Sequence, residues 1–211
     1  MPDEHSNSVE LLGFYGGDLT HALSAWTSTH RELTPEKIER IPALLKMLAT
    51  EGHHTPFEKS AQHFLVTTDI ASHIHIIKHR IGVSVNAESA RYKELKEDKF
   101  YLPEDWPEED KQQLLEWMHC GFHKYHTVIK KLTPVLGRKR AKESARFYLP
   151  YANQITADVM FNFRSLMHFQ KLRNENHAQD EIHEIAEEML QLVRATGAFT
   201  HSLEAFGYGK S

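Results

Sequence analysis

The chain has 211 residues, of which 40% are hydrophobic and 26% charged, and this composition suits one globular domain and excludes a disordered chain. The net charge of −4 argues against a general nucleic-acid coat, and the lack of an 18-residue apolar run excludes a membrane-spanning helix. The acidic N-terminus shows no secretory signal and the single cysteine rules out a disulfide framework, so we expect a cytoplasmic protein.

The first half of the chain alternates strand and helix patterns. In chain order we expect a strand, two helices, a strand, a helix and a loop over 9–13, 19–30, 35–51, 62–68, 70–80 and 82–92. The expected N-caps of the helices are Asp18, Thr34 and Asp69, whose side-chain oxygens can accept the free N–H groups of a first turn. Gly52 should end the second helix.

The second half is dominated by helical periodicity. In chain order we expect a weak strand, two helices, a strand and two further helices over 100–102, 107–132, 138–147, 154–161, 163–173 and 177–195. Pro134 and Gly137 should break the longest helix, and Asn162 should cap the helix that follows it in sequence. This mixture predicts an α+β fold with one modest sheet, in a single domain over 1–211.

Charge is unevenly distributed along the chain. Residues 98–110 hold six acids and one base, whereas residues 130–146 hold seven bases and one acid, Glu143. A basic stretch in an acidic protein suggests a confined site for an anion. A solvated loop and helix end would give the same pattern, and both interpretations stay open at this point.

Histidine is over-represented, with 16 residues, and a polar stripe follows one face of the longest expected helix. The stripe consists of Glu116, His119, His123 and His126. Imidazoles four residues apart can chelate a transition metal. The stripe also lies at the border between the apolar face and solvent, where amphipathic side chains are favoured in any case, so we expect no metal site.

Cys120 is the only candidate for thiol chemistry. It is expected in mid-helix, without an adjacent lysine, arginine or helix N-terminus to stabilise a thiolate. We therefore predict a buried structural cysteine and no cysteine nucleophile.

Two segments combine cations with residues that let a ligand approach closely. In residues 78–92, Lys78, His79 and Arg80 end a helix and precede Gly82 and a run of small polar residues. Guanidinium groups present forked donors that match phosphate oxygens. A basic helix end followed by a polar turn is the alternative interpretation.

The second segment covers residues 162–179. Arg164, His168 and Lys171 share one helix face and would form a row of cations on a helix packed against the core. Arg173 falls at the break before the next helix, where its side chain can enter a cleft. An ordinary amphipathic helix would show the same pattern.

Together these segments resemble the flavin-dependent thymidylate synthases. The family signature is Arg-His-Arg, seven residues and Ser, with Arg-Tyr soon after, and this chain has Lys78-His79-Arg80, eight residues, Ser89 and Arg91-Tyr92. Four further stretches follow in the family's order: GHHTPFE at 52–58, ARFYLP at 145–150, NFRSLM at 162–167, and Leu172-Arg173 with His177-Ala178-Gln179. The similarity covers most of residues 45–190.

The resemblance implies an α+β fold with a central, mostly antiparallel sheet flanked by several long helices. It implies a homotetramer with active sites shared between subunits, and neither a nucleic-acid nor a membrane partner. The implied reaction is reductive methylation of dUMP to dTMP, with FAD as hydride carrier, methylenetetrahydrofolate as carbon donor and NADPH as reductant. No enzyme thiolate is needed, which agrees with the sequence around Cys120.

The resemblance also assigns site residues by position. The expected FAD contacts are Thr55, Lys78, His79, Arg80, Asn162, Arg164, His168 and His177. The expected dUMP contacts are His75, Lys78, Ala87, Glu88, Ser89, Ala90, Arg91, Arg173 and, from a neighbouring subunit, Arg146. Arg173 is the expected catalytic residue, because a positive charge at the uracil edge favours ionised N3 and a more nucleophilic C5.

The chain departs from the family pattern at several positions. Lys78 replaces the first arginine of the signature and loses its bidentate fork. The spacer is one residue longer, so the loop must bulge, and either Ala87 or Glu88 stands at the acidic position. His75 and His168 stand where the family often has Gln and Asn. These changes leave FAD binding expected and loosen strict dUMP specificity.

Three alternatives to dUMP methylation stay open. The longer spacer allows a flavin enzyme of the same fold that modifies another pyrimidine nucleotide. The basic stretch 130–146 allows a non-catalytic module that binds anions or nucleic acid. The histidine stripe His119, His123 and His126 allows a metal-dependent hydrolase.

Overall fold

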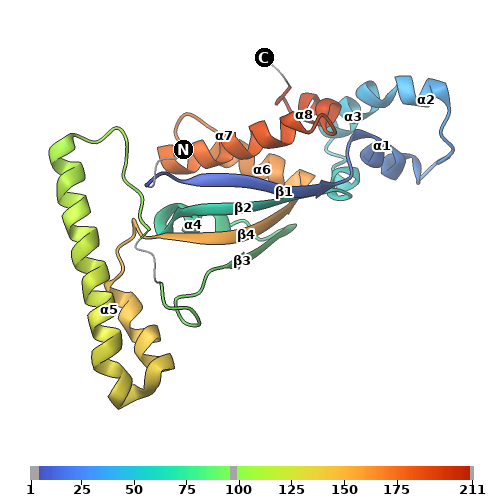
Figure 1. Cartoon of the computed structure of the whole chain (residues 1–211). Helices are drawn as coiled ribbons and strands as arrows, with labels where there is room; N and C mark the ends of the chain where they lie inside the picture. The colour runs from blue at the N-terminus through green and yellow to red at the C-terminus, as the bar shows by residue number, and fades with distance from the viewer. Residues whose placement is uncertain (1–4, 96–98, 210–211) are drawn as a thin grey trace. The chain divides into compact units, whose positions relative to one another are not determined.

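The computed structural model describes residues 5–95 and 99–209 (Figure 1). These residues divide into two compact units. Unit 1 consists of the described residues within 1–8, 66–77 and 86–157. Unit 2 consists of the described residues within 9–65, 78–85 and 158–211. Most boundaries between the units fall inside strands, and the expectation of one domain stays a prediction.

Four strands form one sheet in the order β1-β2-β4-β3. Their bounds are β1 Ser8–Tyr15, β2 Ala61–Asp69, β3 Val83–Ala87 and β4 Gln154–Asn162. Alternate residues of β2 are buried, from Gln62 to Thr68, as expected where one face of a strand packs on a core. The open antiparallel sheet and the helices of the chain confirm the α+β fold.

The sheet corrects two expectations from the sequence. Residues 82–92 were expected to be a loop, yet they contain β3, whose small and polar residues give a weak strand signal and whose order comes from pairing with β4. The strand expected at 100–102 is absent, and only Phe100 forms an isolated bridge, to Asn153. Pairing partners, which the local pattern does not reveal, decide both cases.

The first helices of unit 2 are short. They are α1 Asp18–Trp26, α2 Pro35–Glu39, α3 Ile41–Thr50 and the 3-10 helix η1 Thr55–Glu58. Thr34 Oγ1 accepts the main-chain N–H of Lys37 at 3.4 Å, which confirms this cap. The single helix expected from Pro35 is wrong: it divides at Arg40, because Pro42 in the first turn of α3 has no N–H for a continuous helix.

Asp18 has a different role from the one expected. It lies inside α1, which ends at Trp26 rather than at residue 30, and it does not cap that helix. Its carboxylate accepts the main-chain N–H groups of His201 and Ser202, each at 2.8 Å. These residues belong to the first turn of α8 (Thr200–Ala205), a helix that the sequence analysis missed. Asp18 therefore ties the start of unit 2 to its end.

Two longer helices complete unit 2. Asn162 Oδ1 accepts the N–H of Ser165 at 2.9 Å, so the expected cap and the bounds of α6 (Phe163–Arg173) are confirmed. The next helix, α7 (Asp180–Ala195), begins three residues later than expected. The buried Gln170 side chain donates to the carbonyl of Ala186 at 2.8 Å, which fixes α6 against α7.

Unit 1 contains α4 (Ile70–Ile77) and α5 (Glu108–Ala145), followed by the 3-10 helix η2 (Arg146–Tyr148). Asp69 caps α4 as expected, with Oδ1 2.8 Å from the N–H of Ser72, but the helix ends at Ile77 rather than at residue 80.

The long helix α5 has two legs that meet at Gly137, whose φ of +77° breaks the helix as expected. Pro134 does not break it: the residue lies inside α5, and the non-helical φ and ψ occur only at Gly137. Ala145 packs with Tyr125 and Ile129, so the second leg lies against the first.

Cys120 is exposed, so the prediction of a buried cysteine is wrong. It lies two residues from both Met118 and Phe122, and two residues turn a helix by about 200°. Cys120 therefore points away from the buried face that these two residues form.

Candidate functional site

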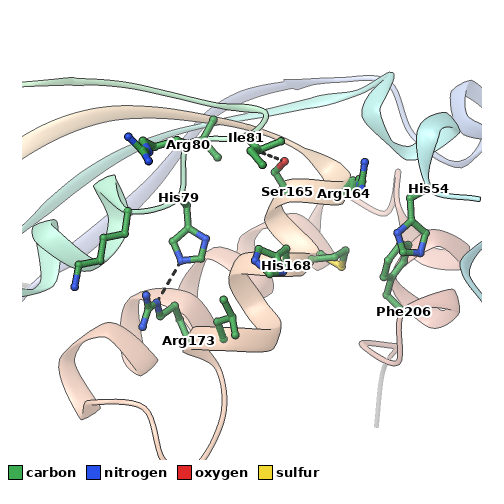
Figure 2. Close-up of a pocket in the computed structure, with 13 residues that line it drawn as sticks. His54, His79, Arg80, Ile81, Arg164, Ser165, His168, Arg173 and Phe206 are labelled. Atoms are coloured by element: carbon green, nitrogen blue, oxygen red, sulfur yellow. Dashed lines mark hydrogen bonds between the residues drawn. The ribbon is translucent and has the colours of Figure 1, made fainter. Parts of the chain in front are cut away.

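A cavity of about 610 Å³ lies within unit 2 (Figure 2). Its walls come from the segment between α4 and β3, from α6, from the residue before η1 and from the residue after α8. The lining residues are His54, Lys78, His79, Arg80, Ile81, Val83, Arg164, Ser165, Met167, His168, Leu172, Arg173 and Phe206. The volume is that of a pocket that encloses an organic ligand.

The wall of this cavity is strongly cationic. Lys78, Arg80, Arg164 and Arg173 line it, and no Asp or Glu is among its lining residues. Arg164 forms an ion pair with Glu58 of η1. Within residues 5–95 and 99–209, Lys78 and Arg80 have no ion-pair partner. The uncompensated charge favours an anionic ligand.

The turn at residues 81–82 fixes the cationic segment to the start of α6. Ser165 Oγ donates to the carbonyl of Ile81 at 2.6 Å, and the N–H of Asn162 donates to the carbonyl of Gly82 at 2.9 Å. Gly82 has a φ of +65°, and a Cβ at this position would lie 2.2 Å from Asn162 Nδ2. Only glycine fits this turn, which lies inside the eight-residue spacer of the motif.

His79 and Arg173 point toward one another in the cavity (Figure 2). Arg173 Nε donates to His79 Nε2 at 3.3 Å. An accepting Nε2 carries no proton, so His79 is neutral and its proton is on Nδ1. The ring packs against the buried Phe169 and against His168, with centroids at 5.0 and 5.8 Å. These contacts fix the direction of the Arg173 guanidinium.

A buried chain of hydrogen bonds supports the aromatic residues behind the cavity. His21 lies between Ser202 and Ser60, with both ring nitrogens 2.8 Å from a hydroxyl, and Ser202 Oγ donates to Asp18 at 2.6 Å. Burial lowers the pKa of His21 to about 4, so the ring is neutral at pH 7. His21 contacts Phe163, the first residue of α6, at a centroid distance of 5.2 Å.

The expected dUMP segment lies in unit 1, in the loop 88–94 that follows β3. Glu88 Oε2 accepts the main-chain N–H of Thr156 at 3.0 Å, and Oε1 accepts from Lys93 at 2.8 Å. Burial opposes ionisation of Glu88, but the hydrogen bonds from Lys93 and Thr156 outweigh it and lower its pKa. The carboxylate of Glu88 therefore fixes the loop to β4.

Arg91 is held by the second leg of α5. Its Nε donates to Glu143 Oε1 at 2.6 Å, and this hydrogen bond to Glu143 is the largest cause of the raised pKa of Arg91. Arg146, at the start of η2, is exposed and has no ion-pair partner among the residues that the structure describes. A second group of cations thus lies within unit 1.

The structure brings part of the expected site together. The expected residues that line the unit 2 cavity are Lys78, His79, Arg80, Arg164, His168 and Arg173. Thr55, Asn162 and His177 belong to the same unit but do not line the cavity, and the Asn162 side chain serves as a helix cap. The expected dUMP contacts His75, Ala87, Glu88, Ser89, Ala90, Arg91 and Arg146 belong to unit 1.

Sequence reasoning missed the apolar and aromatic part of the wall. His54 and Phe206 lie beside one another, with ring centroids 5.4 Å apart. His54 belongs to the GHHTPFE stretch, so that motif could have identified it. Phe206 follows a helix that was not expected, and no local pattern marks it.

The histidine stripe on α5 does not form a metal cluster. Within residues 5–95 and 99–209, no group of three or more His, Cys, Asp or Glu is placed to hold a metal ion. His126 lies 3.7 Å from Glu94 instead.

In the same described part of the chain, no helix has the length and hydropathy needed to cross a membrane.

Comparison with known proteins identifies the family. The family described as thymidylate synthase complementing protein matches residues 10–196, which is most of the chain. The chain belongs to this family. The resemblance to flavin-dependent thymidylate synthases that the motifs carry is thereby confirmed, and the chain is an enzyme of this type.

Similar curated proteins cover nearly the same length. A flavin-dependent thymidylate synthase of Pseudothermotoga lettingae is 32% identical, with 92% of this chain and 87% of that protein covered. Another, of Thermosipho melanesiensis, is 33% identical, with 95% and 91% covered. The family assignment therefore applies to nearly the whole chain.

Similar solved structures have the same fold. A UMP/dUMP methylase, PolB of Streptomyces cacaoi, bound with 5-Br dUMP has a TM-score of 0.80 and 27% identity, covering 97% of this chain and 96% of that one. The same methylase bound with 5-Br UMP has a TM-score of 0.78 and 25% identity, covering 98% and 97%.

Proposed function

We propose that this chain catalyses the reductive methylation of dUMP to dTMP, with FAD as hydride carrier, methylenetetrahydrofolate as carbon donor and NADPH as reductant. The observation that carries the proposal is the cavity of unit 2, where four cationic side chains and no acid line the wall. The relatives named flavin-dependent thymidylate synthases and the S. cacaoi methylase support the reaction and the substrate class.

The residues of the cavity fit FAD. A pyrophosphate requires several cationic donors, which Lys78, Arg80 and Arg164 supply. The ring systems require apolar surface, which is offered by Ile81, Met167, Leu172 and Phe206. When bound, FAD supplies the hydride that converts the transferred carbon to a methyl group. Thr55, Asn162, His168 and His177 complete the proposed contacts.

Arg173 is the proposed catalytic residue. A fixed guanidinium at the uracil edge favours the N3-ionised ring and makes C5 the better nucleophile. The hydrogen bond to the neutral His79 keeps this guanidinium in one direction, so little reorganisation is required. Without a thiol in the reaction, Cys120 has no part in it.

Most of the proposed dUMP contacts belong to unit 1, and one comes from a second subunit. Ser89, Ala90 and Arg91 form the proposed dUMP segment, with His75, Lys78, Ala87 and Glu88 as further contacts. Arg146 is exposed and has no ion-pair partner among the described residues, which supports a role toward a neighbouring subunit. We therefore propose a cytoplasmic homotetramer with shared active sites.

A second candidate substrate is UMP. The S. cacaoi methylase is described with both UMP and dUMP, and its fold covers nearly all of this chain. Ala87 has no carboxylate, and the carboxylate of Glu88 is hydrogen-bonded to β4 and to Lys93. Neither residue therefore offers a free carboxylate to the sugar of the nucleotide. Methylation of UMP would require the same cations and the same cofactor.

Anaerobic mixing of the reduced, FAD-loaded protein with methylenetetrahydrofolate and either dUMP or UMP tests the proposal. We expect methylated nucleotide in the product analysis, with more from dUMP than from UMP. Product from UMP alone would make UMP the substrate in place of dUMP and would leave the proposed reductive methylation unchanged. Failure to retain FAD, or FAD-loaded protein without product from either nucleotide, would overturn the proposed function.

A further inference from the structure

Two ion pairs connect the loop 88–94 to the second leg of α5. Arg91 Nε donates to Glu143 Oε1 at 2.6 Å, and Arg138 Nη2 donates to Glu94 Oε2 at 2.6 Å. The two pairs join the same two segments at the same distance, but the acid lies on the helix in the first and on the loop in the second. Only the first pair involves a residue of the proposed dUMP segment.

Glu143 is placed like a bound anion. It is the one acid among residues 130–146, where seven bases surround it in the sequence. Its Oε1 faces Arg91, and its Oε2 lies 3.5 Å from Arg140. The carboxylate side chain is 17% exposed, whereas Arg91 is 47% exposed. Guanidinium groups that face separate oxygens of one anion can also bind the oxygens of a phosphate.

We propose that Glu143 occupies the phosphate position of the nucleotide site and is displaced when a nucleotide binds, with Arg140 becoming a further phosphate contact beside Arg91. This inference rests on the proposed function, which assigns Arg91 to dUMP. It makes Glu143 an internal competitor that determines how tightly the phosphate is held.

Displacement follows from geometry and charge. The carboxylate already uses Nε of Arg91, so a phosphate that approaches the Nε side of the guanidinium must displace it to make a bidentate contact there. An ionised Glu143 that stayed in place would also repel a phosphate dianion at close range. The hydrogen bond from Arg91 is the main cause of the lowered pKa of Glu143, so the group is ionised at neutral pH. A dianion attracts both arginines more strongly than a carboxylate does and can replace it.

The inference also predicts selectivity for phosphorylated ligands. A nucleoside without phosphate has no group that competes with Glu143 for the arginines, so its affinity does not change when Glu143 is neutralised. The affinity of a nucleoside monophosphate should rise, because its phosphate no longer has to displace a carboxylate. The ratio of the two affinities therefore measures the effect of Glu143.

Calorimetric titration of the FAD-loaded protein with dUMP and with deoxyuridine tests this idea in Glu143→Gln. We expect the variant to bind dUMP roughly two- to fivefold more tightly than the wild type, the range expected for loss of one partly exposed ion pair. Its affinity for deoxyuridine should stay unchanged. Arg140→Gln, which leaves the Arg91–Glu143 pair intact, should weaken dUMP binding.

Glu94→Gln is the matched control. It removes the same charge from an ion pair of the same length between the same two segments, without touching Arg91. We expect it not to tighten dUMP binding. Equal tightening in both variants would mean a general charge effect and would overturn the inference. Weaker or unchanged dUMP binding in Glu143→Gln would also overturn it, because Glu143 would then position Arg91 for the phosphate.

The inference and the proposed function fail in different ways. If the wild type does not bind dUMP, the proposed function fails. Titration with inorganic phosphate then tests the inference on its own. Tighter phosphate binding in Glu143→Gln alone supports displacement of the Glu143 carboxylate by phosphate, and equal phosphate binding in all variants overturns it.

Discussion

The cavity of unit 2 and the loop 88–94 of unit 1 use cations in opposite ways. In the cavity, no acid lines the wall, and Lys78 and Arg80 have no ion-pair partner among the described residues. In unit 1, Arg91 and Arg138 each lie 2.6 Å from a glutamate. Hydrogen bonds of the turn at 81–82 and aromatic contacts shape the cavity, and although Arg164 pairs with Glu58, the charges of Lys78 and Arg80 stay available to a ligand. In the loop, the charges of Arg91 and of the partner of Arg138 are used in ion pairs with α5, beside the hydrogen bonds of Glu88 to β4.

The largest expected effect is on turnover and comes from a residue that lines the cavity. Arg173→Ala should lower turnover by about 100-fold or more while FAD stays bound, because one preorganised charge at the reacting ring is lost. Steady-state kinetics and the FAD absorbance of the purified variant measure both quantities. Lys171→Ala on the same helix, which does not line the cavity, is the control and should stay active. Near-normal turnover of Arg173→Ala would refute the catalytic role.

Gly82→Ala should destabilise unit 2 by about 2–4 kcal/mol, from left-handed strain and overpacking together. Its new Cβ would lie 2.2 Å from Asn162 Nδ2 and 2.5 Å from Ser165 Oγ. Gly197→Ala is the control, since its φ of +69° is similar but nothing lies within 4 Å of the added Cβ. Urea unfolding compares the two variants, and equal losses would show that the contact with α6 is unimportant.

Acid should weaken unit 2 through His21. The pKa of His21 is about 4 in the folded chain and 6.5 when unfolded, so the unfolded chain binds the proton first and stability falls as the pH drops from 6.5 toward 4. The stability difference between the wild type and His21→Asn should shrink by about 2–3 kcal/mol between pH 7 and pH 4.5. Urea unfolding at both pH values measures it. A difference that is constant with pH would contradict a neutral buried His21.

A smaller effect, on FAD affinity, should distinguish a cation of the cavity from a cation of unit 1. Arg80→Ala should weaken FAD binding roughly tenfold or more, since a charge-assisted contact with the pyrophosphate is lost. Arg138→Ala removes an arginine whose charge Glu94 already balances, and it should leave FAD affinity unchanged. Fluorescence titration of the FAD-free protein compares both with the wild type. Unchanged affinity in Arg80→Ala would remove Arg80 from the flavin site.

The smallest effect is expected at Cys120, which is exposed on α5 in unit 1. Cys120→Ser should keep activity and stability within about twofold of the wild type, as for most surface substitutions. Turnover and thermal unfolding measure this. A folded but inactive variant would bring thiol chemistry back into consideration.

Local sequence patterns predicted the elements whose signals are complete within a few residues. Asn162 and Thr34 cap the helices that were expected, because a cap depends only on the residue and the turn that follows it. Asp18 was misread for the same reason: its carboxylate has a suitable partner nearby in the chain, yet it binds α8, 183 residues away. β3 was missed because its order comes from β4 rather than from its own residues.

The family and the residue types of the site followed from motifs, since the spacing of Lys78-His79-Arg80, Ser89 and Arg173 is written in the chain itself. The roles of these residues toward FAD and dUMP stay predictions. Only the tertiary structure shows which cations line the same cavity and which are paired with a glutamate. It also shows that His79 orients Arg173. Charge pairing depends on distances of a few ångströms between segments far apart in sequence, and no local pattern encodes those distances.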